Sequence, residues 1–142
     1  MQKSSGKYSL TQQAEKTGYL CVLIYFMHKS TITVDVHLDT DKIPDKINWS
    51  ATESTAQDAQ DAKAMMLSFW DGKEKAALRI DLWTKEMMMD EMADFVYQNM
   101  MTMADSFERA TKQADLARDM KIFAKAFLKK FQENIEKSKP QQ

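Results

Sequence analysis

A strand that runs directly into a long helical pattern constrains the fold of this chain more than any other feature. Apolar side chains alternate with charged or aromatic ones along the run Leu78-Arg79-Ile80-Asp81-Leu82-Trp83. Alternation with a period of two is typical of a half-buried strand. From Met89 onward the apolar residues recur at helical spacing instead. The junction therefore predicts an α+β fold centred on this strand and on the helix that follows it.

The residues before the junction predict two strands and one helix. Residues 31–38 and 46–50 alternate between apolar and polar side chains, as strands with one wet face do. Pro44 and three aspartates lie in the turn between them, so the two strands should form an antiparallel pair. Apolar residues at helical spacing then predict a helix over residues 58–71, which Gly72 would end.

The residues after the junction predict two long helices, from about Met88 to Ala110 and from about Ala114 to Lys137. No Gly or Pro separates them, so the sequence allows a hairpin or one bent helix. The element order is β-β-α-β-α-α. With a right-handed crossover, this order predicts a small antiparallel three-stranded sheet of order 2-1-3, packed on helices in two layers.

The domain organisation follows from length and composition. A chain of 142 residues suits one domain, which we expect over residues 29–137, with a frayed tail at residues 138–142. Residues 1–28 look unlike the rest, because a polar stretch is followed by an apolar run at residues 18–27.

Three interpretations of that apolar run compete. It is shorter than the roughly 20 residues that a transmembrane helix needs. It has the length of a signal-peptide core, but no small-x-small cleavage site follows it. We favour the third interpretation, in which Met27 is the initiator and the residues before it are an upstream extension.

The sequence offers little support for a catalytic, cofactor or metal site. The net charge is −1 with interleaved acids and bases, which gives no basic surface for nucleic acid. The single cysteine excludes a multi-cysteine zinc site, and no Gly-rich phosphate loop or G-x-S-x-G elbow is present. Residues 39–45 lack the glycine and the closing glutamate of a calcium loop and fit a solvated turn. We expect no enzymatic activity, no cofactor and no metal.

Trp83 is the residue whose position is hardest to explain by folding alone. It lies on the polar strand face with Arg79 and Asp81, and Met87 and Met88 follow it. Methionine is flexible and polarisable, so it fills core gaps or lines adaptable binding surfaces. Cover by the methionines or by the third helix is the simpler interpretation for Trp83. The alternative is a protein-contact surface formed by Arg79, Asp81, Trp83, Met87 and Met88, since Trp is enriched at interface centres.

Several segments, in order, carry a family resemblance. They are Val36–Asp39, Pro44 with Ile47-x-Trp49, Lys63–Asp71, Leu78–Lys85, Asp90–Met92, Met103–Asp105 and Arg109–Thr111. Over these segments the chain resembles the gliding motility-associated GldC family of Bacteroidetes-type bacteria. The Leu78–Lys85 block is the most specific. The family often has a proline at the position of Met88, and residues 1–27 have no counterpart in it.

The resemblance implies a small cytoplasmic accessory protein, linked to gliding motility and its secretion machinery through protein partners. It implies no catalytic residues and no membrane span. Two other functions stay open from the residues: a small-molecule binder or enzyme with a Met-lined pocket, and a chaperone-like binder of apolar segments. Exposed edge strands allow a homo-oligomer without requiring one.

Overall fold

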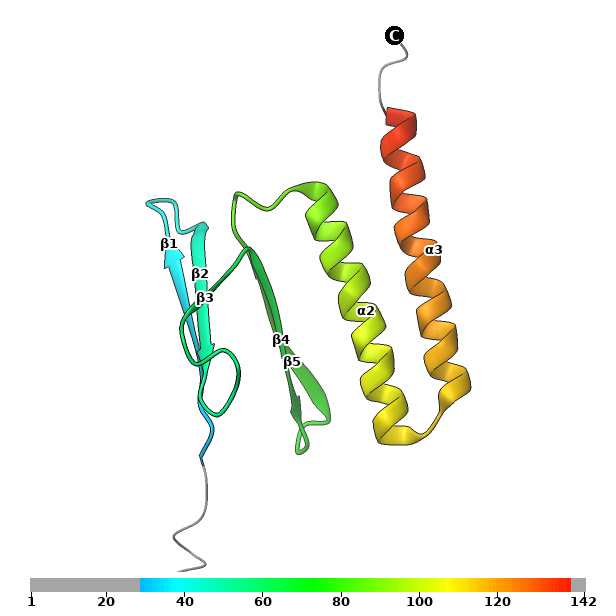
Figure 1. The fold of residues 1–142 in the computed structure, drawn as a ribbon, viewed down its shortest axis with the longest axis horizontal. Coiled ribbons are helices and arrows are strands. Elements are labelled where there is room, and N and C mark those ends of the chain that lie inside the picture. The colour runs from blue at the N-terminus through cyan, green and yellow to red at the C-terminus, as the bar shows by residue number, and fades with distance from the viewer. Residues whose placement is uncertain (1–28, 139–142) are drawn as a thin grey trace, which may run out of the picture. The chain divides into compact units, whose positions relative to one another are not determined.

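The computed structural model describes residues 29–138 as strands followed by helices (Figure 1). The elements are β1 (Ile32–Leu38), β2 (Pro44–Ala51), β3 (Gln60–Ala62), β4 (Ala64–Asp71), β5 (Ala76–Trp83), α2 (Met89–Thr111) and α3 (Ala114–Ser138). The predicted α+β class is confirmed. The predictions for residues 1–28 and for the tail beyond residue 138 lie outside the described residues.

The chain groups into two compact units. The larger unit holds residues 35–48 and the described residues from 61 onward, and the smaller unit includes residues 29–34 and 49–60. In the smaller unit, the N–H of Thr31 donates to the Thr52 hydroxyl (2.8 Å) and the N–H of Thr52 donates to the Thr31 carbonyl (3.0 Å). Ala56 is buried there. The candidate site lies in the larger unit.

The strands form two sheets in place of the single predicted one. β1, β2 and β3 form a sheet in that order, and β4 pairs with β5 in antiparallel orientation. The predicted strands at residues 31–38, 46–50 and 78–83 correspond closely to β1, β2 and β5. The predicted order 2-1-3 is wrong, because it pairs β5 with β1, whereas β5 pairs with β4.

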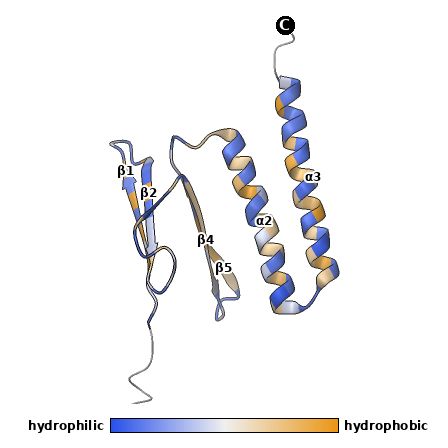
Figure 2. Cartoon of the chain, in the orientation of Figure 1, coloured by the Kyte–Doolittle hydropathy of each residue, from blue (hydrophilic) through white to orange (hydrophobic). Residues whose placement is uncertain are grey.

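The helix predicted over residues 58–71 is also wrong, and with it the order β-β-α-β-α-α. Residues 60–62 and 64–71 are strands β3 and β4. The run from Ala64 to Trp70 is almost continuously apolar, so it fits a strand as well as a helix (Figure 2). Gly72 lies in the turn that joins β4 to β5, where the Asp71 carboxylate accepts the N–H of Lys73 (2.8 Å). Pairing with β5 therefore decides the conformation of this run.

The predicted turn between β1 and β2 is present. One oxygen of the Asp39 carboxylate accepts the N–H of Ile43 (3.0 Å) and of Asp41 (2.9 Å), and these bonds lower the pKa of Asp39, the Ile43 bond most. The Lys85 ammonium lies 2.7 Å from the Asp45 carboxylate and 3.4 Å from that of Asp39. Lys85 thus links this turn to the end of β5.

Helices α2 and α3 form a hairpin rather than one bent helix (Figure 1). Lys112 ends α2 in the left-handed conformation (φ 61°), and its N–H donates to the Glu108 carbonyl at 2.9 Å. Ala104, Ala117 and Ala124 have no exposed surface, so alanines form the helix contact. Small side chains let two helices approach closely. Larger apolar side chains of the two helices, such as Phe123, are left exposed.

The alanine contact leads to a stability prediction. Ala124→Leu should lower the free energy of unfolding by about 1–3 kcal/mol, because added methylenes in a closely packed contact force backbone or rotamer shifts. Chemical denaturation followed by circular dichroism measures the change. Ala126→Leu, at an exposed position on the same helix, is the matched control and should change stability by less than about 0.5 kcal/mol. Equal effects of the two variants would contradict the alanine contact.

Candidate functional site

The five residues predicted to form a contact surface all line one hollow. Arg79, Asp81 and Trp83 come from β5, and Met87 and Met88 come from the loop between β5 and α2. The hollow has a volume of about 510 Å³, and all its lining residues belong to the larger unit. The structure thus brings the predicted residues together, while their contact with a partner stays a prediction. We call this site the Met-lined hollow.

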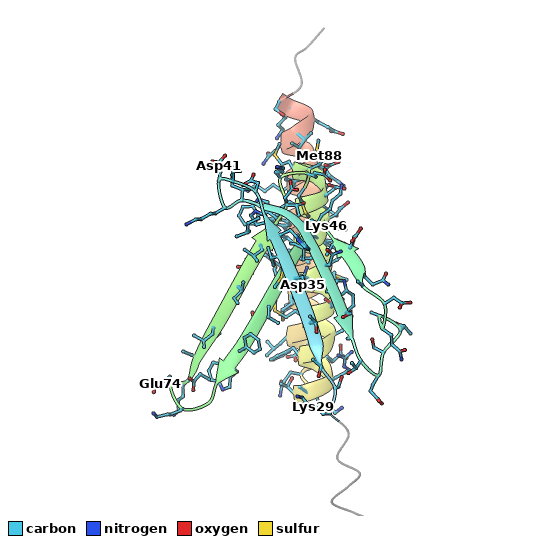
Figure 3. The ribbon with its side chains drawn as sticks, turned by 90° about the vertical axis from the view of Figure 1, so that its left-hand side faces the viewer. Lys29, Asp35, Asp41, Lys46, Glu74 and Met88 are labelled. Carbon is cyan, nitrogen blue, oxygen red and sulfur yellow. The ribbon has the colours of Figure 1, made fainter. Side chains whose placement is uncertain are left out.

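The register of the β4–β5 hairpin forms the floor of the hollow. Successive side chains of a strand point to opposite faces, so Arg79, Asp81 and Trp83 share one face of β5. The register places Met66 opposite Asp81 and Ala64 opposite Trp83, which brings these β4 residues to the same face. Glu74 marks the turn of the hairpin and Met88 the start of α2 at the other end (Figure 3).

The floor carries one ion pair within an otherwise apolar lining. The Arg79 Nε lies 2.7 Å from an Asp81 carboxylate oxygen, and this hydrogen-bonded contact raises the pKa of Arg79. Both side chains remain partly exposed, so the pair is screened by solvent and contributes little to stability. Its main effect on the site is to keep two charged side chains in fixed positions on the floor of an otherwise apolar hollow.

The start of α2 is fixed by a second ion pair. The Glu91 carboxylate accepts the N–H of Met88 at 2.9 Å and the Lys63 ammonium at 2.6 Å. The Lys63 contact lowers the pKa of Glu91 most, followed by the Met88 N–H, and the same pair raises the pKa of Lys63. Lys63 immediately precedes β4, so this contact ties the hairpin to the first turn of α2 and positions Met87 and Met88.

Trp83 is not covered, so the simpler interpretation of its position is wrong. Its side chain is 56% exposed. The methionines of the loop and of α2 line the hollow around it rather than closing over it. Thr84, the next residue, is only 3% exposed, and its N–H donates to the Lys63 carbonyl at 2.7 Å. A buried backbone anchor therefore holds an exposed tryptophan.

Sequence reasoning missed the lining residues that come from β4 and from the body of α2. These are Ala64, Met65, Met66, Met92 and Phe95. The β4 residues were missed because this segment was predicted as a helix, so no register with β5 was expected. The Lys63–Asp71 and Asp90–Met92 segments of the family resemblance were the available signal. Thr84 was likewise part of the Leu78–Lys85 block without being assigned a role.

The chemistry of the site favours binding of apolar groups. Its only charged side chains are Arg79 and Asp81, which neutralise each other. Within residues 29–138, no three His, Cys, Asp or Glu side chains gather as a metal site would require. No helix in that range is long and apolar enough to cross a membrane.

The fold and the hollow define a small α+β protein whose candidate site is an open, methionine-rich surface. A protein-family model described as "Gliding motility-associated protein GldC-like" matches residues 44–133. The chain therefore belongs to the GldC-like family, and the resemblance seen in its sequence is confirmed. The match includes every residue of the Met-lined hollow. No curated protein and no solved structure matches the chain.

The Glu91 ion pair leads to a pH prediction. Since the folded pKa of Glu91 is lowered from its ordinary value of 4.5, the stabilisation is fully present above pH 4.5 and is lost as pH falls through the lowered value. Glu91→Gln should therefore be less stable than the wild type at neutral pH. The difference should disappear in acid.

Denaturation curves across this pH range measure the effect. Asp94→Asn is the matched control, because Asp94 lies one turn further along α2 and forms no ion pair with the described residues. A difference between Glu91→Gln and wild type that persists unchanged in acid would contradict the assigned ion pair.

Proposed function

We propose that the chain is a non-catalytic accessory protein of the gliding motility and secretion machinery, which binds a protein partner through the Met-lined hollow. The observation that carries the proposal is the convergence of Arg79, Asp81, Trp83, Met87 and Met88 on one open hollow. Membership of the GldC-like family supplies the link to gliding motility.

The exposure of the large side chains supports a protein partner. Trp83 and Met88 are 56% and 62% exposed, although both are large and apolar. Burying such a side chain fully against a partner is favourable by roughly 1.5–3 kcal/mol. Tryptophan is enriched among residues that dominate binding energy, and methionine adapts its shape to the surface it meets. The expected partner segment therefore presents bulky apolar side chains.

The Arg79–Asp81 pair adds a polar element to this surface. Its partly exposed guanidinium and carboxylate can hydrogen-bond a partner's backbone or polar side chains at the edge of the apolar contact.

We place the protein in the cytoplasm. A chain with one cysteine cannot form an internal disulfide, so its folding needs no oxidising compartment.

Copurification from the native organism tests the proposal. Trp83→Ala and Met88→Asp should each weaken the affinity for the partner at least about tenfold, equivalent to about 1.4 kcal/mol, and so reduce the amount of partner recovered. Matched controls are Trp70→Ala and Met103→Asp, since both residues are at least half exposed and lie outside the Met-lined hollow. The controls should retain the partner. If the Trp83 and Met88 variants together leave every captured protein unchanged, the surface assignment is wrong.

A small-molecule binder is the second candidate. The volume of about 510 Å³ lies within the range typical of ligand pockets, roughly 300–1,000 Å³, and the lining is mostly apolar. No separate observation favours the chaperone-like alternative over these two.

Thermal shift across a ligand library tests the second candidate. A ligand present at a hundred times its Kd should add about 2.7 kcal/mol of stability, provided it binds only the folded chain. Trp83→Ala should abolish the shift and Trp70→Ala should preserve it. A library without a stabilising ligand, or a shift unaffected by Trp83→Ala, would contradict a small-molecule site in this hollow.

A further inference from the structure

The outer edge of β5 is an open sheet edge. β4 and β5 form a two-stranded sheet, and no third strand among residues 29–138 joins it. A two-stranded hairpin is marginally stable by itself, and an open edge presents unpaired backbone groups that favour pairing with another strand. We propose that β5 pairs in antiparallel orientation with β5 of a second copy of this chain, forming a two-fold dimer with a four-stranded sheet.

The hydrogen-bond pattern defines which residues face the open edge. The N–H of Thr84 donates to the Lys63 carbonyl at 2.7 Å, which makes this a hydrogen-bonded pair. Such pairs alternate along an antiparallel ladder, so the even-numbered residues of β5 bond inward to β4. The outward backbone groups then belong to the odd-numbered residues Ala77, Arg79, Asp81 and Trp83.

The apolar face limits the registers that two β5 strands can adopt. Leu78, Ile80 and Leu82 alternate with Arg79 and Asp81, so they share the other face of β5 with the residues they oppose on β4. Leu82 and its β4 partner Met65 also line part of the Met-lined hollow. Residues opposite each other on paired strands lie on the same face, and a slip of one residue exchanges the faces. Among the registers that keep these faces, Ile80 meets another large apolar side chain when it opposes Leu78, Ile80 or Leu82 of the second copy.

The charges on β5 select one of these three registers. Pairing Ile80 with Leu78 of the second copy places Arg79 opposite Arg79, and pairing it with Leu82 places Asp81 opposite Asp81. Like charges directly opposite are destabilising, whereas opposite charges are favourable. Pairing Ile80 with Ile80 places each Arg79 opposite the other copy's Asp81 and each Leu78 opposite the other copy's Leu82. The two-fold axis then passes by Ile80.

This register extends an ion pair that already exists. Arg79 and Asp81 of one strand are in contact at 2.7 Å. In the dimer each of these charges gains an opposite charge across the strands, so the four side chains form a ring of alternating sign. The two Met-lined hollows lie on the same face of the shared sheet, since Arg79 and Asp81 line them. The dimer therefore offers a partner two adjacent copies of the site.

The outer edge of β4 lacks this complementarity. Its outward residues Ala64, Met66, Ser68 and Trp70 carry no charge. The charged residues at its ends are already engaged, Lys63 with Glu91 and Asp71 with the backbone of the following turn. Charge complementarity thus assigns the dimer contact to β5.

Cysteine cross-linking tests the register directly. In the full chain with Cys21→Ser, Ile80→Cys should form a disulfide-linked dimer on mild oxidation. Residues at a non-hydrogen-bonded pair have Cα atoms about 4.5 Å apart, which lies within the range that disulfides span. Leu67→Cys is the matched control, because Leu67 lies directly opposite Ile80 in the hairpin. It should stay unlinked, and linkage of Leu67→Cys in place of Ile80→Cys would overturn the proposal.

Charge reversal provides a second test that does not depend on oxidation. Light scattering should give a dimer mass for the wild type. Arg79→Asp should shift the protein to a monomer, because it places two acids opposite each other across the strands. The double variant Arg79→Asp with Asp81→Arg should recover the dimer, since it restores opposite charges in the same register. A wild-type monomer, or a double variant that stays monomeric while folded, would overturn the proposal.

These outcomes are separable from those of the proposed function. Loss of partner recovery in Trp83→Ala with an unchanged dimer mass would support the hollow as a site and leave the β5 contact intact. A monomeric wild type that still captures its partner would contradict the proposed dimer and leave the proposed function intact.

Discussion

The pairing of β4 with β5 is the interaction on which the candidate site depends. Its register places Met66 opposite Asp81 and Leu67 opposite Ile80, which separates a mixed face from an apolar one. A slip of one residue in either strand would exchange that strand's two faces and take its side chains out of the Met-lined hollow. The Lys63–Glu91 contact at 2.6 Å then ties the beginning of β4 to the first turn of α2. The strand face and the helix start thus form one surface.

The parts of the fold that the sequence predicted correctly are those with a single periodicity. The alternation in β1 and β5 fits only a strand, and the spacing in α2 and α3 fits only a helix. The run from Ala64 to Trp70 satisfies both periods, because nearly every position is apolar. Its conformation depends on hydrogen bonds to β5, a partner that local pattern does not reveal. The missed strand and the wrong sheet order therefore have the same cause.

The part of the candidate site that is formed by residues close together in the sequence could be predicted. Arg79, Asp81 and Trp83 share a face by strand geometry alone, and Met87 and Met88 follow within a few residues. The wall formed by Met66 and its neighbours on β4 required the register, so it could not be foreseen. The exposure of Trp83 depended on how the methionines arrange around it, because flexible side chains can either cover a ring or surround it.

The open hollow reflects how little large apolar surface the described residues bury. Ile47, at 1% exposed, is their only large side chain that is fully buried. Alanines form the contact between α2 and α3, so Leu116 and Phe123 remain outside it. Exposed apolar surface beyond a few hundred Å² marks interaction sites in soluble proteins. Burial of this exposed apolar surface against a partner or a second copy would therefore favour association. A partner or second copy that binds only the folded chain also stabilises the folded state.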